Sequence, residues 1–187
     1  MSMPQLTQGW TVEAVHALPD DGNRYEVIDG KLFVTPAPRW PHQRAVVELC
    51  RILYEYLKPE RIGEVLVAPA DVVFSPTRLV QPDVFVVPFV NGRRAEQFVD
   101  VGRLHLAAEV LSPSTARADR VAKRTLFHDE DVPEYWIVDL DARTFERSTP
   151  ADSRMEIVVD QLTWHPDGAS VPLVIDLVEF FRTVLDS

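Results

Sequence analysis

The chain has 187 residues, 46% of them hydrophobic, and a chain of this length usually forms one domain around one core. Its formal net charge of −10 and isoelectric point near 4.9 exclude a broad electrostatic attraction to nucleic-acid phosphates, so any DNA contact must be local. The only cysteine, Cys50, excludes an intramolecular disulfide, and because it lies in an apolar run we interpret it as a packing residue. The sequence shows neither a basic N-terminal region with an apolar signal core nor an apolar stretch of roughly 20 residues, which predicts a cytoplasmic protein without a membrane partner.

The first half of the chain predicts both helices and strands. Asp29-Gly30 favours a two-residue hairpin turn, because both residues tolerate positive φ. Val46, Leu49 and Leu53 recur at the three- and four-residue intervals of an amphipathic helix. In chain order we expect a short helix (residues 11–17), a β-hairpin (24–35), a long helix (42–57) and three strands (64–68, 71–74 and 83–87).

The second half predicts two further helices among strands. Hydroxyl residues at 112–115 precede a helix that they can cap, and Asp176 with Glu179 has the spacing of a capping box. We expect, in order, a strand (105–111), a helix (116–128), a buried strand (135–139), an edge hairpin (145–147 and 155–159) and a closing helix from Asp176. This order predicts an α/β fold with helices on the faces of a sheet, in a single domain spanning residues 1–187.

Two carboxylates occupy positions where an isolated charge is costly. Asp83 follows Pro82 at the start of an apolar strand, and Glu109 lies inside another apolar strand. A buried carboxylate costs several kcal/mol unless it is paired or bound to a cation. Two of them on neighbouring strands would repel each other, and a hard cation such as Mg²⁺ or Mn²⁺ commonly holds such a pair together. For each residue alone, an ion pair with an arginine or exposure at a strand end explains the charge at least as well.

Lysine is scarce in this chain, with Lys at positions 31, 58 and 123 against 16 Arg. Lys123 is therefore of interest, because a lysine can present a compact charge beside a reacting water or accept its proton, whereas arginine stays charged. The simpler alternative is an i,i+4 pair with Asp119 on an exposed helix, which stabilises by only about 0.3–0.5 kcal/mol.

Several motifs occur together in a fixed order. They are RYEVIDG (24–30), PAP (36–38) followed by His42, QPDV (81–84), EVLSPST (109–115), Asp119 with Lys123, and EYWIVD (134–139). The set resembles the Uma2 family, described as restriction endonucleases of the PD-(D/E)XK superfamily, and the resemblance covers roughly residues 20–185. The ordered set is more specific than any one motif, because a lone Pro-Asp dipeptide occurs by chance in most chains.

The resemblance implies a restriction-endonuclease-like mixed sheet flanked by helices, with Asp83 and Glu109 as catalytic ligands of Mg²⁺ or Mn²⁺. In the superfamily a lysine stands two residues after the second carboxylate, but that position is Leu111 in this chain. In proteins similar to this one the lysine lies on the following helix, where Lys123 is placed to supply it. The implied activity is hydrolysis of DNA phosphodiester bonds, and the implied assembly is a homodimer.

The resemblance also implies supporting residues. Glu26 would be a supporting or water-holding carboxylate, and His42 would contact a phosphate or orient Glu26. Three arginines on one predicted helix would bind the DNA backbone, namely Arg117, Arg120 and Arg124. The alternatives are a hairpin salt bridge between Glu26 and Arg24, an ordinary histidine at a helix start, and a solvated arginine face.

Two other functions are compatible with the sequence. Leu111 and the negative net charge favour a binding module that keeps the nuclease-like fold without turnover. A carboxylate and metal site would also serve a small-molecule hydrolase. A serine hydrolase with Ser112 as nucleophile is disfavoured because no Gly-x-Ser-x-Gly motif occurs, and zinc is disfavoured because no Cys/His cluster has metal-ligand spacing.

Overall fold

The computed structural model describes residues 9–113 and 115–186. In the first half of the chain the elements are α1 (Val12–His16), β1 (Arg24–Ile28), β2 (Lys31–Thr35), α2 (Trp40–Glu60), β3 (Gly63–Val67), β4 (Val72–Ser75), β5 (Arg78–Val80) and β6 (Val84–Pro88). In the second half they are the 3₁₀ turn η1 (Phe98–Asp100), β7 (Leu106–Val110), the π-helical segment η2 (Ala118–Lys123), α3 (Arg124–Asp129), β8 (Tyr135–Asp139), β9 (Thr144–Ser148), β10 (Glu156–Val158), β11 (Gln161–Trp164), β12 (Leu173–Asp176), α4 (Leu177–Phe181) and the π-helical segment η3 (Arg182–Asp186).

Local signals explain where the predicted elements begin and turn. The side chain of Thr11 caps α1 by accepting a hydrogen bond from Ala14 N–H, and Asp176 caps α4 by accepting one from Glu179 N–H. Asp29 and Gly30 both have positive φ, as a tight hairpin turn requires. The hairpin of β1 and β2, the long helix α2, the predicted strands and the closing helix are confirmed.

Three short strands do not follow from the sequence patterns. β5 pairs with β1 and β4, while β11 and β12 form a separate antiparallel hairpin. Each has three or four residues, which are too few for a clear alternation of apolar and polar side chains. The predicted helix at 116–128 is present, but it is divided into η2 and α3. Ser114, one of its expected caps, lies outside the described residues.

A six-stranded sheet in the order β10-β9-β8-β7-β6-β3 forms the centre of the fold. Its neighbouring strands are antiparallel except β7 and β8, which are parallel. A parallel pair needs a crossover connection, and here η2 and α3 lie in that crossover. The crossover therefore leaves the sheet at the carboxyl end of β7, beside Glu109.

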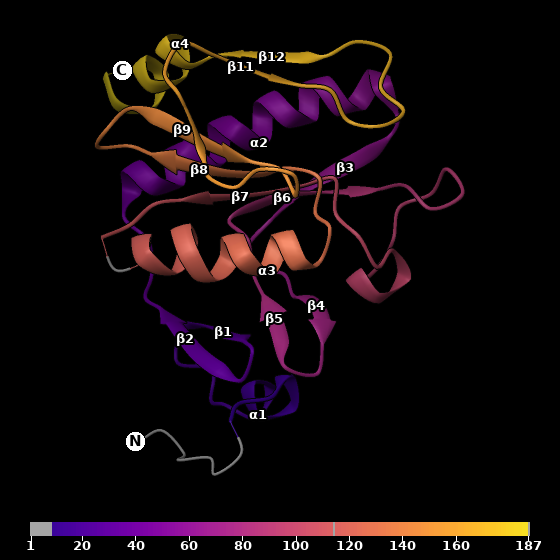
Figure 1. Cartoon of the computed structure of the whole chain (residues 1–187), viewed down its shortest axis with the longest axis vertical. Helices are drawn as coiled ribbons and strands as arrows, with labels where there is room; N and C mark the ends of the chain where they lie inside the picture. The colour runs from indigo at the N-terminus through magenta and orange to yellow at the C-terminus, as the bar shows by residue number, and fades with distance from the viewer. Residues whose placement is uncertain (1–8, 114, 187) are drawn as a thin grey trace.

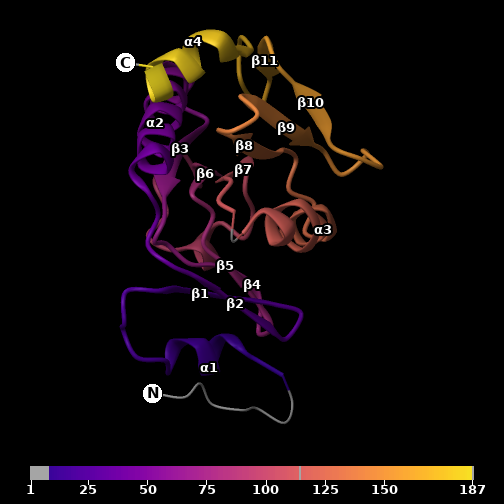
Figure 2. The same ribbon diagram turned by 90° about the vertical axis from the view of Figure 1, so that its left-hand side faces the viewer.

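A second, antiparallel sheet has the order β2-β1-β5-β4. Figure 1 shows α2 and α3 on opposite sides of the six-stranded sheet, with α3 on the side of the second sheet. Figures 1 and 2 both place the second sheet and α1 at the end of the molecule opposite α4. This mixed sheet with helices on both faces agrees with the predicted α/β fold class.

Two hydrophobic clusters lie on opposite faces of the six-stranded sheet. The larger joins one face to α2, α4 and the β11–β12 hairpin around Trp136, and it includes Ala108 and Val110. The smaller joins the other face to α3 and the second sheet around Phe127. Because successive residues of a strand point to opposite faces, Glu109 points toward the smaller cluster. The carboxylate is therefore enclosed between two layers of the molecule.

Two further observations concern the expectations drawn from composition. Cys50 is partly buried on α2 and burial raises the pKa of its thiol, which agrees with its interpretation as a packing residue. Within the described part of the chain, no helix has both the length and the apolar character that a membrane crossing needs.

Gly63 at the start of β3 is predicted to tolerate no side chain. It pairs with Pro88 of β6, and an added Cβ would lie 2.3 Å from the carbonyl oxygen of Val87. We expect Gly63→Ala to lower the free energy of unfolding by about 1–3 kcal/mol, because the β6 backbone must move. Urea unfolding followed by circular dichroism measures the change. Val67→Ala, at the half-exposed end of the same strand, should cost less than about 1 kcal/mol, and equal losses in the two variants would contradict the steric explanation.

Candidate active site

The pairing of β6 with β7 brings the two predicted carboxylates together. Val84 is opposite Ala108, so the next positions along the two strands are Asp83 and Glu109. Their side chains alternate with Val84 and Val110, which point into the larger cluster, and therefore face α3. Asp83 is 3% exposed and Glu109 is 2% exposed. Exposure at a strand end, one alternative explanation for these charges, is excluded.

Lys123 brings a cation to this face from η2. Its Nζ donates to Glu109 Oε1 at 2.9 Å and lies 3.0 Å from Glu26 Oε2 and 3.6 Å from Asp119 Oδ1. All four residues are at most 2% exposed. The i,i+4 pair of Asp119 and Lys123 therefore exists, but its predicted location on an exposed helix face is wrong.

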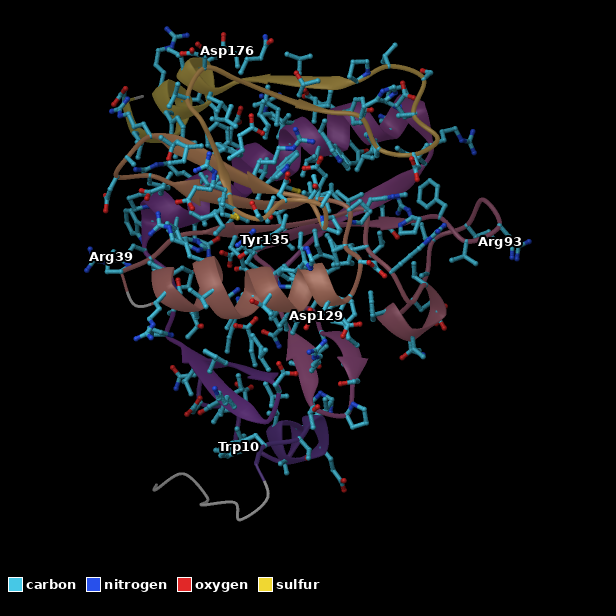
Figure 3. All side chains as sticks on the ribbon, in the orientation of Figure 1. Trp10, Arg39, Arg93, Asp129, Tyr135 and Asp176 are labelled. Carbon is cyan, nitrogen blue, oxygen red and sulfur yellow. The ribbon has the colours of Figure 1, made fainter. Side chains whose placement is uncertain are left out.

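The π-helical segment η2 carries Asp119 and Lys123 as its buried residues. The N–H of Arg124 bonds to the carbonyl of Asp119, five residues earlier, which widens the helical turn. The hydroxyl of Tyr135 in β8 donates to the same carbonyl at 3.0 Å. Figure 3 shows Tyr135 between the helix and the sheet. The wide turn is thus attached to the strand that follows the crossover.

Asp83 accepts hydrogen bonds from three elements. Arg24 Nη1 of β1 donates to Oδ1 at 2.7 Å, while His42 Nε2 of α2 and the N–H of Val110 lie 3.0 and 2.9 Å from Oδ2. A carboxylate only accepts hydrogen bonds, so Nε2 of His42 carries the proton in this contact. His42 contacts Asp83 instead of Glu26, which corrects the hypothesis that it orients Glu26.

Glu26 links the second sheet to Lys123. Its Oε1 accepts a hydrogen bond from the N–H of Gln81 at 2.8 Å, and its Oε2 faces Lys123. The guanidinium of Arg24 bonds to Asp83 and to the carbonyl of Gln81 at 3.3 Å. The alternative of a hairpin salt bridge between Arg24 and Glu26 is therefore not what the structure contains.

The two strand carboxylates have opposite pKa shifts. Burial raises the pKa of Asp83, but the hydrogen bond and charge of His42 and the charge of Arg24 outweigh burial and hold that pKa well below its usual range. Burial raises the pKa of Glu109, Lys123 opposes the rise, and the nearby carboxylates, beginning with Asp83, add to it. The pKa of Glu109 lies well above its usual range. Asp83 is therefore ionised at neutral pH, whereas Glu109 retains a proton more readily than an exposed glutamate.

A cavity of about 710 Å³ adjoins these side chains. One wall is the segment before α2 and its first turn, where Pro36, Pro38 and Pro41 fix the backbone φ angle. Arg39, labelled in Figure 3, belongs to the same wall, and the neighbouring Trp40 is 82% exposed. The site residues that line the cavity are Arg24, His42, Asp83, Glu109, Asp119 and Lys123.

The three predicted DNA-binding arginines lie in different environments. Arg120 lines the cavity and donates to Glu146 and Asp139, each at 2.8 Å. Arg124 donates to Ser148 Oγ at 3.2 Å and to a backbone carbonyl of the following turn. Arg117 is exposed outside the cavity lining. Of the three, Arg120 alone lines the cavity.

The donors present fit a hard divalent cation. In the described part of the chain no three His, Cys, Asp or Glu side chains are grouped as a ready-made metal shell. Mg²⁺, however, commonly binds through one or two carboxylates and keeps several waters. Asp83 and Glu109 line the cavity, and the carboxylate of Asp119 is buried beside them and accepts no hydrogen bond of normal geometry in that part of the chain.

Sequence reasoning missed Arg24 as the partner of Asp83. Arg24 and Glu26 are two residues apart on β1, so both point to one face of the strand, and this spacing was the available signal. Tyr135 had no comparable signal, because its contact with the carbonyl of Asp119 depends on the wide turn of η2.

Comparisons with known proteins concern the family and the fold of the chain. A model of the Uma2 family, described as "Putative restriction endonuclease", matches residues 12–178. Among solved structures, the chain is similar to "a putative nuclease belonging to DUF820 from Anabaena variabilis ATCC 29413", with a TM-score of 0.78 and 22% identity over 94% of this chain and 99% of that one. At this identity the similarity shows a shared fold. None of the curated proteins matches the sequence.

The Arg24–Asp83 pair should contribute strongly to stability. We expect Arg24→Ala to lower the free energy of unfolding by about 3–5 kcal/mol, because it leaves a buried carboxylate without its guanidinium partner. Arg51→Ala is the matched control, since Arg51 pairs with Glu48 and Glu55 on the exposed face of α2 and should cost less than about 1 kcal/mol. Guanidinium chloride unfolding of both variants measures the difference. Similar decreases in the free energy of unfolding would show that the buried pair stabilises the fold no more than the exposed pair does.

Proposed function

Because the chain belongs to the Uma2 family, we propose that it is a metal-dependent endonuclease that hydrolyses phosphodiester bonds in DNA. The observation that carries the proposal is the 2.9 Å contact between Lys123 Nζ and Glu109 Oε1. Leu111 occupies the strand position at which the superfamily has its lysine, and Lys123 brings an ammonium group to the second carboxylate from the following helix. Asp83, Glu109 and Lys123 line one cavity, as a shared reaction site requires.

In this proposal Asp83 and Glu109 bind Mg²⁺ or Mn²⁺. An ionised carboxylate has about four lone-pair positions, and Asp83 uses three of them for Arg24, His42 and Val110. One position is left for an ion. When bound, the ion would supply Lewis-acid chemistry that polarises a phosphate and acidifies a water.

Lys123 acts as a positioned ammonium group. Burial lowers the pKa of Lys123, but the charges of Glu109, Glu26 and Asp119 outweigh burial and raise it. A charged ammonium group donates hydrogen bonds and stabilises developing negative charge, so Lys123 would orient the attacking water and the phosphate. Glu26, 3.0 Å from Nζ, is a positioning residue for Lys123.

Contact with DNA is local in this proposal. Arg120 and Arg39 line the cavity and would bind the phosphates next to the cleaved bond, with Arg117 beyond them. Arg124 and His42, predicted as substrate contacts, would have to give up the partners they have in the structure. A homodimer, which the resemblance implies, would present two such cavities to a duplex.

A small-molecule hydrolase is the second candidate function. The observation that favours it is the cavity volume of about 710 Å³, which lies within the range of about 300–1,000 Å³ typical of small-ligand sites. The net charge of −10 also gives long DNA no general attraction.

The endonuclease proposal is tested by cleavage of supercoiled plasmid and single-stranded DNA in Mg²⁺ or Mn²⁺. We expect the wild type to cleave only with the metal, and Asp83→Asn and Lys123→Met each to reduce the rate by at least about 100-fold. Gel electrophoresis of the products measures the rate.

Lys58→Met is the control for Lys123→Met, because Lys58 is an exposed lysine of α2 outside the cavity. It should cleave at the wild-type rate. If the wild type cleaves neither substrate but hydrolyses small phosphodiesters in a manner that depends on Asp83, the second candidate function is favoured. If it cleaves nothing, a binding module is the better description.

Leu111 follows Glu109 by two residues and packs against the smaller cluster, on the side of the sheet that Glu109 faces. A lysine at position 111 would therefore lie near Glu109, which allows a second test of the role of Lys123. In the Lys123→Ala background, we expect Leu111→Lys to restore part of the metal-dependent cleavage, because it returns an ammonium group to Glu109 from the strand. The double variant is compared with Lys123→Ala and with Leu111→Met in the same background. Equal activity in all three would show that a cation beside Glu109 is not what the reaction needs.

A further inference from the structure

The carboxylate of Asp119 is buried and weakly paired. Its side chain is 1% exposed and lines the cavity, and neither carboxylate oxygen accepts a hydrogen bond of normal geometry from the described residues, although the nearby Thr115 hydroxyl helps to lower its pKa. The cation that contacts it is Lys123 Nζ, at 3.6 Å from Oδ1. An ionised group in this position is costly for the fold. The carboxylate therefore needs an explanation other than stability.

Apart from its 3.6 Å contact with Lys123 Nζ, the carboxylate of Asp119 has no evident structural role among the described residues. It lies inside η2 and caps no helix, and the bond from Tyr135 goes to its backbone carbonyl. The side chain therefore adds charge to the site and no structural hydrogen bond.

Asp119 and Glu109 face the same small volume. Glu109 Oε1 lies 2.9 Å and Asp119 Oδ1 lies 3.6 Å from the same Lys123 nitrogen. Mg²⁺ and Mn²⁺ are hard cations that bind carboxylate oxygens and complete their shell with water and phosphate. The pair is therefore suited to share an ion.

The formal charge of the buried ionic cluster around Lys123 indicates how many divalent ions the site can bind. We define this cluster by its direct ionic contacts as Arg24, Glu26, Asp83, Glu109, Asp119 and Lys123. Four carboxylates face one guanidinium and one ammonium, so the formal charge of the cluster is two negative when all four carboxylates are ionised. One divalent cation balances this charge, whereas two would leave an equal excess of positive charge in a buried site.

We propose that Asp119 is a further ligand of the site's cation, alongside Glu109, and that each chain binds one divalent ion. The proposal rests on the metal site of the proposed function and adds a ligand and a stoichiometry to it. The ion competes with Lys123 for the oxygens of Glu109 and Asp119. Glu26 then remains as the carboxylate that holds Lys123.

Calorimetric titration of the full chain with Mn²⁺ alone tests the proposal. We expect one ion per chain in the wild type and an affinity at least about tenfold weaker in Asp119→Asn. Asp129→Asn is the matched control, because Asp129, labelled in Figure 3, ends α3, which continues η2, and its carboxylate pairs with Arg78 outside the cavity. It should bind Mn²⁺ like the wild type.

Thermal unfolding distinguishes a metal-binding role of Asp119 from a structural role. Without metal, Asp119→Asn should raise the melting temperature by about 2–4 °C, because it removes a buried carboxylate whose cation contact, at 3.6 Å, is with a lysine shared by two other acids. It should also lose most of the rise that Mn²⁺ gives the wild type. A lower melting temperature without metal would identify Asp119 as structural and overturn the proposal.

Three further results would overturn the proposal. They are unchanged Mn²⁺ affinity in Asp119→Asn when Asp83→Asn weakens binding, two ions per wild-type chain, and no binding by the wild type. The first of these leaves the endonuclease proposal intact. Conversely, the protein could bind one Mn²⁺ ion in a manner that depends on Asp119 and yet cleave no DNA. That result would support Asp119 as a metal ligand and contradict the endonuclease proposal.

Discussion

The ammonium group of Lys123 joins three layers of the molecule. It contacts Glu26 from the second sheet, Glu109 from the six-stranded sheet and Asp119 from its own helical segment. In a buried environment each of these carboxylates depends on that cation, because water is not available to solvate it. The relative positions of the two sheets and the crossover helix are therefore linked to a single nitrogen atom.

The surroundings of Asp83 show the complementary arrangement. Arg24, His42 and Val110 saturate most of this carboxylate and keep it ionised, whereas Glu109 shares one lysine with two other acids. Neighbouring acids whose environments move their pKa values apart are typical of reaction sites, where different protonation states serve different roles.

The sequence predicts the parts of this site that depend on local pattern. Asp83 and Glu109 are recognisable because a charge interrupts an apolar strand, and Lys123 because lysine is rare in this chain. The role of Asp119 was hidden by its spacing from Lys123, which an exposed α-helical pair would also have. The wide turn of η2 and the contact from Tyr135 depend on tertiary structure. The different environments of Arg117, Arg120 and Arg124 depend on it as well. The short strands β5, β11 and β12 likewise exist through their partners.

The wall formed before α2 has a consequence for recognition. Pro36, Pro38 and Pro41 restrict the backbone in the free protein, so little conformational entropy is left for this segment to lose when a ligand enters. The exposed ring of Trp40 is presented from the same preorganised stretch. A molecule that binds here must therefore match the existing shape of this side of the cavity. The conformational entropy lost on binding is then mainly that of the ligand.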